Sequence, residues 1–298
     1  MQGRSRLRET HFHGLSTSPR ATMNKAVKRL RLDLHVHSRF SSDALSTPEE
    51  LWHMCKTAGL DGFAITDHDR AGGYARLVQL GLADPNGKSV DGVLVIPGVE
   101  VSCVEGHVLV LGAGWDAAPG TSAAQVVRRA HSLGALAIAA HPMERSRWGV
   151  GRSVLETVGF DGVEAHNSKT LERGANVLAE RFAAERGLPM TAGSDSHFAT
   201  TLGRAHTIVE AAETSVEAAL AGIKLGRTEL VRGFHTHAEI ARYVARGWLT
   251  RPWLIELAKR KAQVRRMRRI ASRAVSLTPQ GLPGGAFEVF EGVEVVGA

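Results

Sequence analysis

Histidines and acids stand where the short apolar runs of this sequence end. Asp33, His35 and His37 alternate along the first run, and Asp67-His68-Asp69 follows the second. Because successive side chains of a strand alternate between its two faces, the first three residues are expected to share one face. Comparable residues mark five later runs, namely Glu100, His107, His141, His166 with Asn167, and Asp195 with His197.

The chemistry of this set is that of hard and borderline metal ions. Imidazole and carboxylate ligands without thiolate favour Zn²⁺, Mn²⁺ or Fe²⁺. A carboxylate can bridge two cations, and cations about 4 Å apart can stabilise both the attacking and the leaving oxygen of a phosphoryl displacement. A lone His-x-His would be weak support for this. The ordered set His-x-His, Thr-Asp-His-Asp, Pro-Gly-Val-Glu, Ala-His-Pro and Ser-Asp-Ser-His indicates a metal-dependent hydrolase.

Such residues can act together only if the fold gathers them. Between Leu30 and about Val231, apolar runs alternate with helical patterns, which is typical of βα units and a parallel sheet. In a parallel barrel the carboxyl ends of the strands meet at one mouth. We therefore expect an α/β fold, a distorted TIM-like (β/α)7 barrel with a C-terminal helical extension. Its strands are predicted at 30–38, 62–66, 93–96 with 99–102, 107–112, 135–140, 162–165 and 189–192.

Capping signals predict where the helices begin. Thr-Pro-Glu-Glu at 47–50 is a capping box with proline at the first helical position. A second capping box predicts a helix over 122–134, and a third helix is expected over 171–185, before a glycine. Beyond the barrel, 238–247 and 252–273 are expected to be helical.

Composition places the chain among ordinary globular proteins. It has 298 residues, of which 43% are hydrophobic and 22% charged. No apolar run approaches the roughly 18 residues that a membrane-spanning helix needs, so no membrane partner is expected. Two cysteines, Cys55 and Cys103, exclude a disulfide framework and are expected to be buried. A reducing, cytoplasmic location fits best.

Charge is spread unevenly along the chain. The net charge of +7 hides a value of +7 for residues 1–31 and +8 for 251–273, which leaves about −8 for the rest. An acidic body suits cations, and basic ends suit a phosphate polymer. We expect a disordered or mis-assigned basic segment at 1–29, a metal-dependent barrel at 30–232, and an extension with a basic helix at 233–298.

The motifs resemble those of the PHP (polymerase and histidinol phosphatase) superfamily over residues 31–231. They read DLHVHS at 33–38, ITDHD at 65–69, PGVEVS at 97–102, AHP at 140–142 and GSDSH at 193–197. The chain looks most like the stand-alone branch with 3′,5′-nucleoside bisphosphate phosphatases and 5′→3′ exonucleases. That resemblance implies a seven-unit distorted barrel and three metal ions, usually manganese, zinc or iron. The ligands that it implies are His35, His37, Asp43, His68, Glu100, His107, His141, Asp195 and His197.

Further residues are expected around these ligands. Asp33 and Asp69 would accept hydrogen bonds from ligand imidazoles. Arg145 and Arg147 lie in a glycine-containing loop and could bind substrate phosphate, as could Asn167. The residues expected to take part in catalysis are His197, Asp195 and Arg145. Four histidines are not expected to be ligands, namely His131, His166, His235 and His237.

The expected partners are nucleotides or 5′-phosphorylated nucleic-acid ends, with no obligate protein partner. One alternative is a small-metabolite phosphatase of the histidinol phosphatase kind. A second is an amidohydrolase-type barrel, but the predicted strand at 107–112 lacks the lysine that many of those enzymes use. A third is a non-catalytic binding module, which filled ligand positions disfavour.

Overall fold

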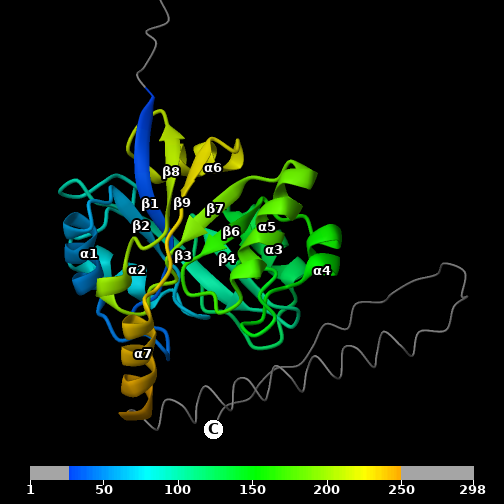
Figure 1. Cartoon of the computed structure of the whole chain (residues 1–298). Coiled ribbons are helices and arrows are strands. Elements are labelled where there is room, and N and C mark those ends of the chain that lie inside the picture. Colours follow the sequence, from blue (N-terminus) through cyan, green and yellow to red (C-terminus); the bar gives the residue numbers. More distant parts are fainter. Residues whose placement is uncertain (1–26, 250–298) are drawn as a thin grey trace, which may run out of the picture.

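The computed structural model describes residues 27–249, which form a barrel-like sheet with helices on its outer side (Figure 1). None of the helices in this range combines the length and apolar composition that crossing a bilayer requires. The expected basic helix at 252–273 and most of segment 1–29 lie outside the described residues. In chain order the elements are β1 (Lys28–Val36), α1 (Pro48–Thr57), β2 (Gly62–Ile65), α2 (Gly72–Gln79), β3 (Leu94–Ser102), β4 (His107–Leu111), α3 (Ala123–Ser132), β5 (Leu136–Ala139), α4 (Arg152–Thr157), β6 (Gly162–Asn167), α5 (Arg173–Arg186), β7 (Met190–Gly193), the 3-10 turn η1 (Ala199–Thr201), β8 (His206–Ala211), α6 (Val216–Lys224), β9 (Thr228–Val231) and α7 (His237–Leu249).

The nine strands form one sheet in the order β7-β6-β5-β4-β3-β2-β1-β8-β9. This confirms the expected barrel-like α/β fold. The expectation of an all-parallel sheet is wrong in two places. Strand β4 is antiparallel to both β3 and β5, because a short turn rather than a helix joins it to β3. Strands β8 and β9 are also antiparallel to their neighbours.

The sheet closes on itself without a continuous ladder. No backbone ladder joins β7 to β8 or β9 within the described chain, but two threonine side chains connect them. Thr207 Oγ1 donates to Ala192 O at 2.9 Å and accepts from Ala192 N at 2.8 Å. Thr228 Oγ1 donates to Met190 O at 2.8 Å. An isolated bridge pairs Val36 with Ser196. We call this line, made of the two threonine contacts and the isolated bridge, the seam.

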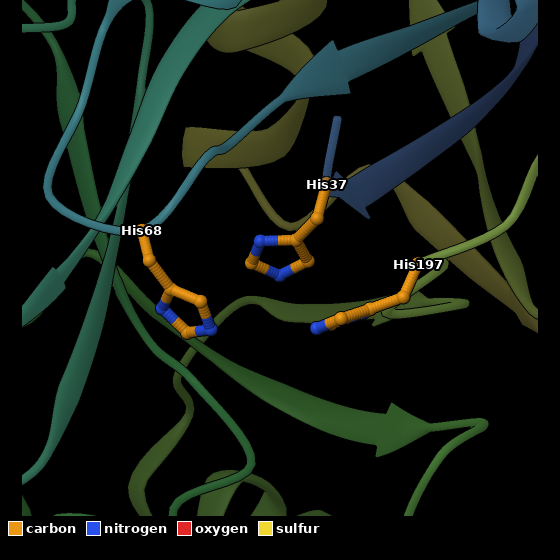
Figure 2. Close-up of side chains that lie close together, drawn as sticks. All are labelled: His37, His68 and His197. Atoms are coloured by element: carbon orange, nitrogen blue, oxygen red, sulfur yellow. The ribbon is translucent and has the colours of Figure 1, made fainter. Parts of the chain in front are cut away.

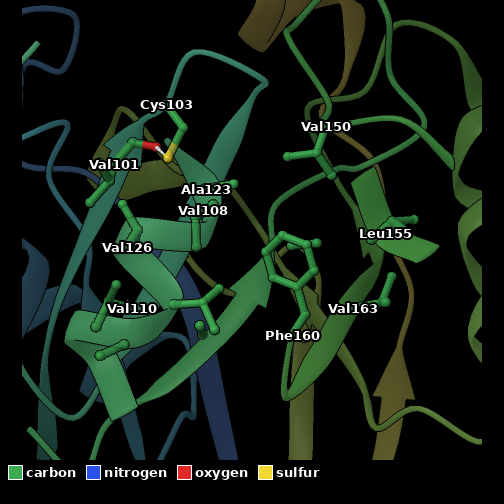
Figure 3. Packing of buried hydrophobic residues seen from close by; sticks show 14 of the residues in the cluster. Val101, Cys103, Val108, Val110, Ala123, Val126, Val150, Leu155, Phe160 and Val163 are labelled. Carbon is green, nitrogen blue, oxygen red and sulfur yellow. Dashed lines mark hydrogen bonds between the residues drawn. The ribbon is translucent and has the colours of Figure 1, made fainter. Parts of the chain in front are cut away.

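Leucine and isoleucine side chains fill much of the interior of the barrel. A buried cluster joins Leu32 and Leu34 of β1 to apolar residues of β3, β4, β5 and α6. A second cluster packs β3 to β6 against α3, α4 and α5, with Phe160 and Cys103 among its members (Figure 3). A third packs Phe63 and its neighbours against α1 and α2. Cys55 and Cys103 are both buried, as expected.

The capping signals are confirmed. Thr47 and Glu50 form a reciprocal capping box at α1, and Ser122 and Gln125 form another at α3. Gly187 ends α5 in the left-handed conformation with φ 62°. Helices α2 and α4 were not predicted, because their N-caps, Ala71 and Gly151, offer no side-chain hydrogen bond. Helix α7 confirms the helix expected at 238–247 and extends away from the barrel at the end where β1 finishes (Figure 1).

Candidate metal centre

A bulge in β1 aims its histidines at the centre of the mouth. Asp33 pairs with Phe63 but Val36 pairs with Ile65, so one extra residue lies between them. The bulge shifts the alternation of faces. His35 and His37 both face Glu100, with Nε2 of each 3.3 Å from Glu100 Oε2, whereas Asp33 faces the amides of Ser194 and Gly203. The expectation that all three share one face is wrong for Asp33.

Two loops bring the remaining acids and histidines of the mouth together. The segment after β1 lies against the one after β7, since Leu45 N donates to His197 O at 3.0 Å. Asp43 Oδ2 lies 3.2 Å from His197 Nε2 and 3.5 Å from His68 Nε2. Asp195 Oδ1 lies 3.5 Å from His37 Nε2. Asp43 is therefore part of the cluster.

Glu100 lies at the centre of five imidazoles. Its Oε2 is 3.3 Å from Nε2 of both His35 and His37 and 3.1 Å from Nδ1 of His68. Its Oε1 is 3.0 Å from His107 Nδ1 and 3.2 Å from His141 Nε2. The carboxylate thus faces one histidine set with each oxygen, which is the geometry that a bridging ligand needs.

The cluster has the unsatisfied polar atoms that a cation would bind. Buried side-chain atoms rarely lack hydrogen bonds. Among the described residues, seven buried atoms of this cluster have none: Nε2 of His35 and His37, Nδ1 of His68, His107 and His141, and Oδ1 of Asp43 and Asp195. Three groups of ligand atoms are close enough to hold an ion: His37, His68 and His197, whose rings converge in Figure 2; His35, His37 and Glu100; and His68, Glu100 and His107. These residues therefore fit divalent metal ions.

Three residues of the mouth have an unusual backbone. Asp69, His141 and Asp195 have φ values of 55°, 28° and 52°, in the left-handed region that non-glycine residues seldom adopt. Such residues persist where the surrounding structure holds them, and they concentrate at functional sites. The sharp turns at these positions let residues directly after the strands point into the cluster.

Sequence reasoning missed two acids that hold predicted ligand histidines in place. Glu164 Oε1 lies 2.9 Å from His35 Nδ1, and its Oε2 accepts from His141 N at 2.8 Å. Asp67 accepts from Ser41 Oγ at 2.8 Å, and Ser41 Oγ lies 3.1 Å from His37 Nδ1. The only available signal for Glu164 was an acid inside an otherwise apolar strand.

Asp33 and Asp69 act on the backbone in this structure. Asp33 accepts from the amides of Ser194 at 2.9 Å and Gly203 at 2.8 Å, and so fixes the segment that carries Asp195. Asp69 Oδ1 accepts from Ser102 N at 2.8 Å. The expectation that Asp33 orients an imidazole is therefore corrected.

The predicted substrate residues differ in position. Arg147 reaches the cluster, where its guanidinium donates to Asp195 Oδ2 and, at 3.1 Å, to Asn167 Oδ1. Asn167 also donates to Glu164 and Asp195, both at 3.1 Å, so protein groups already occupy its amide. Arg145 is exposed and has no ion pair with the described residues. A cation that sequence reasoning passed over, Lys169, also lies in the cluster.

The other histidines have different surroundings. His166 contacts Gly233 O at 2.9 Å and Asn176 Nδ2 at 3.2 Å, which fits a structural role. His131 pairs with Asp161 at 2.8 Å on the outer surface, and His237 is exposed. His235 is closer to the site than expected. Burial lowers its pKa to about 4, against the opposing charge of Asp195.

Electrostatics divides the cluster into charged and neutral groups. Burial opposes ionisation of Glu100, but nearby histidines outweigh it and hold its pKa well below the usual range. Burial likewise opposes protonation of His68, yet Glu100 and Asp43 raise its pKa to about 9. Burial and the charge of Arg147 lower the pKa of His141 to about 4. His141 is therefore neutral at pH 7, and His68 is protonated.

Metal affinity should therefore rise with pH. A cation must displace the proton of His68, and below its pKa of about 9 this proton competes with the metal. Each displaced proton makes log K rise by about one per pH unit. Calorimetric titration of the protein with Zn²⁺ or Mn²⁺ between about pH 6.5 and 8.5 measures this slope. His68→Gln should lower this slope by about one log unit per pH unit, and a wild-type affinity independent of pH would contradict the assignment.

Loss of Glu164 should weaken metal binding although it touches no predicted ion. Carboxylates that orient ligand histidines typically contribute about 10- to 100-fold to metal affinity or activity. Glu164→Gln is expected to lose this amount in a Mn²⁺ titration, because His35 is no longer held by a charged acceptor. The matched control is Asp161→Asn, which removes an acid paired with His131 far from the cluster. Equal effects of both changes would contradict the positioning role.

Comparison with known proteins gives matches over parts of the chain. Residues 173–228 match the family model described as PHP-associated. An uncharacterized protein of Methanocaldococcus jannaschii is 27% identical over 149 residues, which cover 47% of this chain and 82% of the relative. These matches cover only part of the chain.

Solved structures share the fold. A two-domain protein of Bacteroides vulgatus, named for its predicted PHP-like metal-dependent phosphoesterase, superposes with a TM-score of 0.54 at 19% identity, over 74% of this chain and 70% of that one. A lesion-specific endonuclease, endonuclease Q of Pyrococcus furiosus, gives 0.53 at 20% identity, over 68% of this chain and 58% of that one. The family match agrees with the predicted resemblance to the PHP superfamily, and these solved structures share the fold of the chain.

Proposed function

From this PHP-like barrel and its histidine–carboxylate cluster, we propose that the chain is a metal-dependent phosphoesterase. Its proposed substrates are nucleotides, either 3′,5′-nucleoside bisphosphates or the 5′-phosphorylated ends of RNA and DNA. The observation that supports this most directly is Glu100 between five imidazoles, with Arg147 beside them. The nine predicted ligands are proposed to hold three divalent ions of Mn, Fe or Zn.

The protein groups around the ions have distinct roles in this proposal. Divalent cations would supply a polarised water and neutralise charge on the phosphate. Asp195 is held by Arg147 and Asn167, which fixes one wall of the site. Neutral His141 offers a lone pair at ordinary pH. Of the two arginines predicted from the sequence to bind phosphate, Arg147 reaches the cluster and Arg145 does not, and we propose that Arg147 fixes the position of Asp195.

The preference for nucleotides rests on two supports. Basic segments at 1–31 and 251–273 suit a phosphate backbone, since Lys and Arg contacts supply much of the affinity for nucleic acid. The second support is the likeness to the lesion-specific endonuclease Q. This likeness also favours a second candidate function, cleavage within damaged DNA. The chain covers only 58% of that enzyme, so we place terminal phosphates first.

An activity panel on metal-loaded protein tests the proposal. The substrates are a 3′,5′-bisphosphonucleotide, 5′-phosphorylated RNA and DNA oligomers, histidinol phosphate, an aryl phosphate and a duplex with an abasic lesion. We expect phosphate or nucleotide release from the first three. Faster histidinol phosphate hydrolysis would instead support the metabolite alternative, and internal cleavage of the duplex would support the endonuclease.

His197→Ala is the control for this panel. It should abolish hydrolysis with metal supplied while the protein stays folded, because the ring contacts Asp43 and Asp195 but belongs to no apolar cluster. Circular dichroism checks folding. Wild-type activity in this variant, or no hydrolysis of any substrate by loaded wild-type protein, would overturn the proposal.

A further inference from the structure

Lys169 is a half-buried cation that the expected ligand set leaves without a role. It lies in the loop between β6 and α5, and its side chain is 17% exposed. Its Nζ is 2.8 Å from His197 Nε2, 3.1 Å from His197 Nδ1 and 3.6 Å from Asp195 Oδ1. Its backbone N donates to Asn167 Oδ1 at 2.9 Å, which anchors the loop beside the cluster. The ammonium therefore touches two predicted metal ligands.

The ring of His197 cannot readily serve both Lys169 and a metal ion. His197 offers one nitrogen to the His37, His68 and His197 group that is close enough to hold an ion. Lys169 Nζ lies within 3.1 Å of both ring nitrogens, and two positive charges at one imidazole repel each other. Lys169 and an ion at this group therefore compete for His197. A lysine with a flexible stem can leave this contact by rotating its side chain.

The charges of the cluster indicate where the ammonium would go. Asp43, Glu100, Glu164 and Asp195 carry four negative charges in the cluster, and Arg147 and Lys169 carry two positive ones. Two or more divalent ions would make the sum positive. A buried positive excess is unfavourable unless an anion balances it. A phosphate monoester, which carries two negative charges, is suited to this.

On the basis of the proposed function, we propose that Lys169 is a phosphate-binding residue that exchanges its contact with His197 for the substrate phosphate when a metal ion binds. Arg147 remains tied to Asp195 and Asn167 on the other side of the carboxylate. The two cations then have different tasks. Arg147 fixes the predicted metal ligand Asp195, and Lys169 contacts the phosphate of the substrate. This assigns the site a preference for terminal phosphate monoesters over diesters, which carry one charge.

Calorimetry on the full chain tests this without relying on turnover. Mn²⁺ is titrated into the protein, and inorganic phosphate is then titrated into the Mn²⁺-loaded protein. Lys169→Met should bind Mn²⁺ several-fold more tightly, because the competitor for His197 is gone. The same variant should bind phosphate about 10- to 100-fold more weakly, as expected for loss of a charged hydrogen bond.

Two variants make the result decisive. Lys169→Arg keeps the charge and should recover most of the phosphate affinity, and it serves as the folded variant if Lys169→Met does not fold. Lys88→Met removes a lysine paired with Glu213 on the surface and should change neither titration. Unchanged phosphate affinity in Lys169→Met, or weaker Mn²⁺ binding, would overturn the assignment. If phosphate binds as expected but no ester is hydrolysed, only the proposed function fails.

Discussion

Replacing Glu100 by glutamine should lower the affinity for metal and the rate of phosphoester hydrolysis, each by more than about a hundredfold. Groups that merely orient ligands typically contribute 10- to 100-fold, and Glu100 contacts five histidines directly. Glutamine keeps the shape but supplies only one oxygen and no charge. Its amide nitrogen would face His107 and His141 or the other three rings, where a cation would have to bind.

Mn²⁺ titration and hydrolysis of an aryl phosphate measure the effect of Glu100→Gln. Its matched control is Glu105→Gln in the same hairpin. Glu105 accepts a hydrogen bond from Ala123 N at 2.9 Å at the start of α3, away from the histidines. This control should retain metal affinity and activity. Retention of both in Glu100→Gln would show that this carboxylate does not bridge ions.

Gly193→Ala should both destabilise the fold and disturb the site. A Cβ at this position would lie 2.5 Å from His35 Cβ and 2.9 Å from Glu164 Oε1. The backbone of β7 must therefore move, or the contact between His35 and Glu164 must break. Overpacking of this kind typically costs about 1–3 kcal/mol. We expect a lower midpoint of chemical denaturation and weaker Mn²⁺ binding in the same variant.

Gly174→Ala provides the comparison. This glycine lies in α5, and nothing lies within 4 Å of a Cβ added there. Alanine is favoured over glycine in a helix by up to about 1 kcal/mol, so the midpoint should rise and metal binding should stay the same. Equal midpoints for Gly193→Ala and wild type would contradict the crowding at β7.

The sequence predicted the site best where a histidine or an acid stands beside an apolar run. Histidines and acids next to apolar runs are costly in a core unless something uses them, so Glu100 and His141 could be identified without coordinates. His107 is instructive because it stands at the start of its run. A parallel strand would have put it at the wrong end of the barrel, and antiparallel β4 brings it to the mouth.

What could not be predicted depends on local backbone geometry. The bulge in β1 reverses the face of Asp33, and no residue of DLHVHS signals an extra position. The left-handed turn at Asp195 is likewise imposed by its surroundings. Lys169 was missed because a lone lysine after a strand is ordinarily a solvated loop residue, and only the packing of the loop shows otherwise.

The seam between β7 and its neighbours gives the predicted ions a mechanical part. His37 follows β1 on one side of it, and His197 follows β7 on the other. An ion held by both histidines would join the two edges of the sheet at the place where hydrogen bonding between strands is interrupted. Metal binding should then reduce local opening of the barrel at this edge, so amide exchange in β7 should slow most when metal is added.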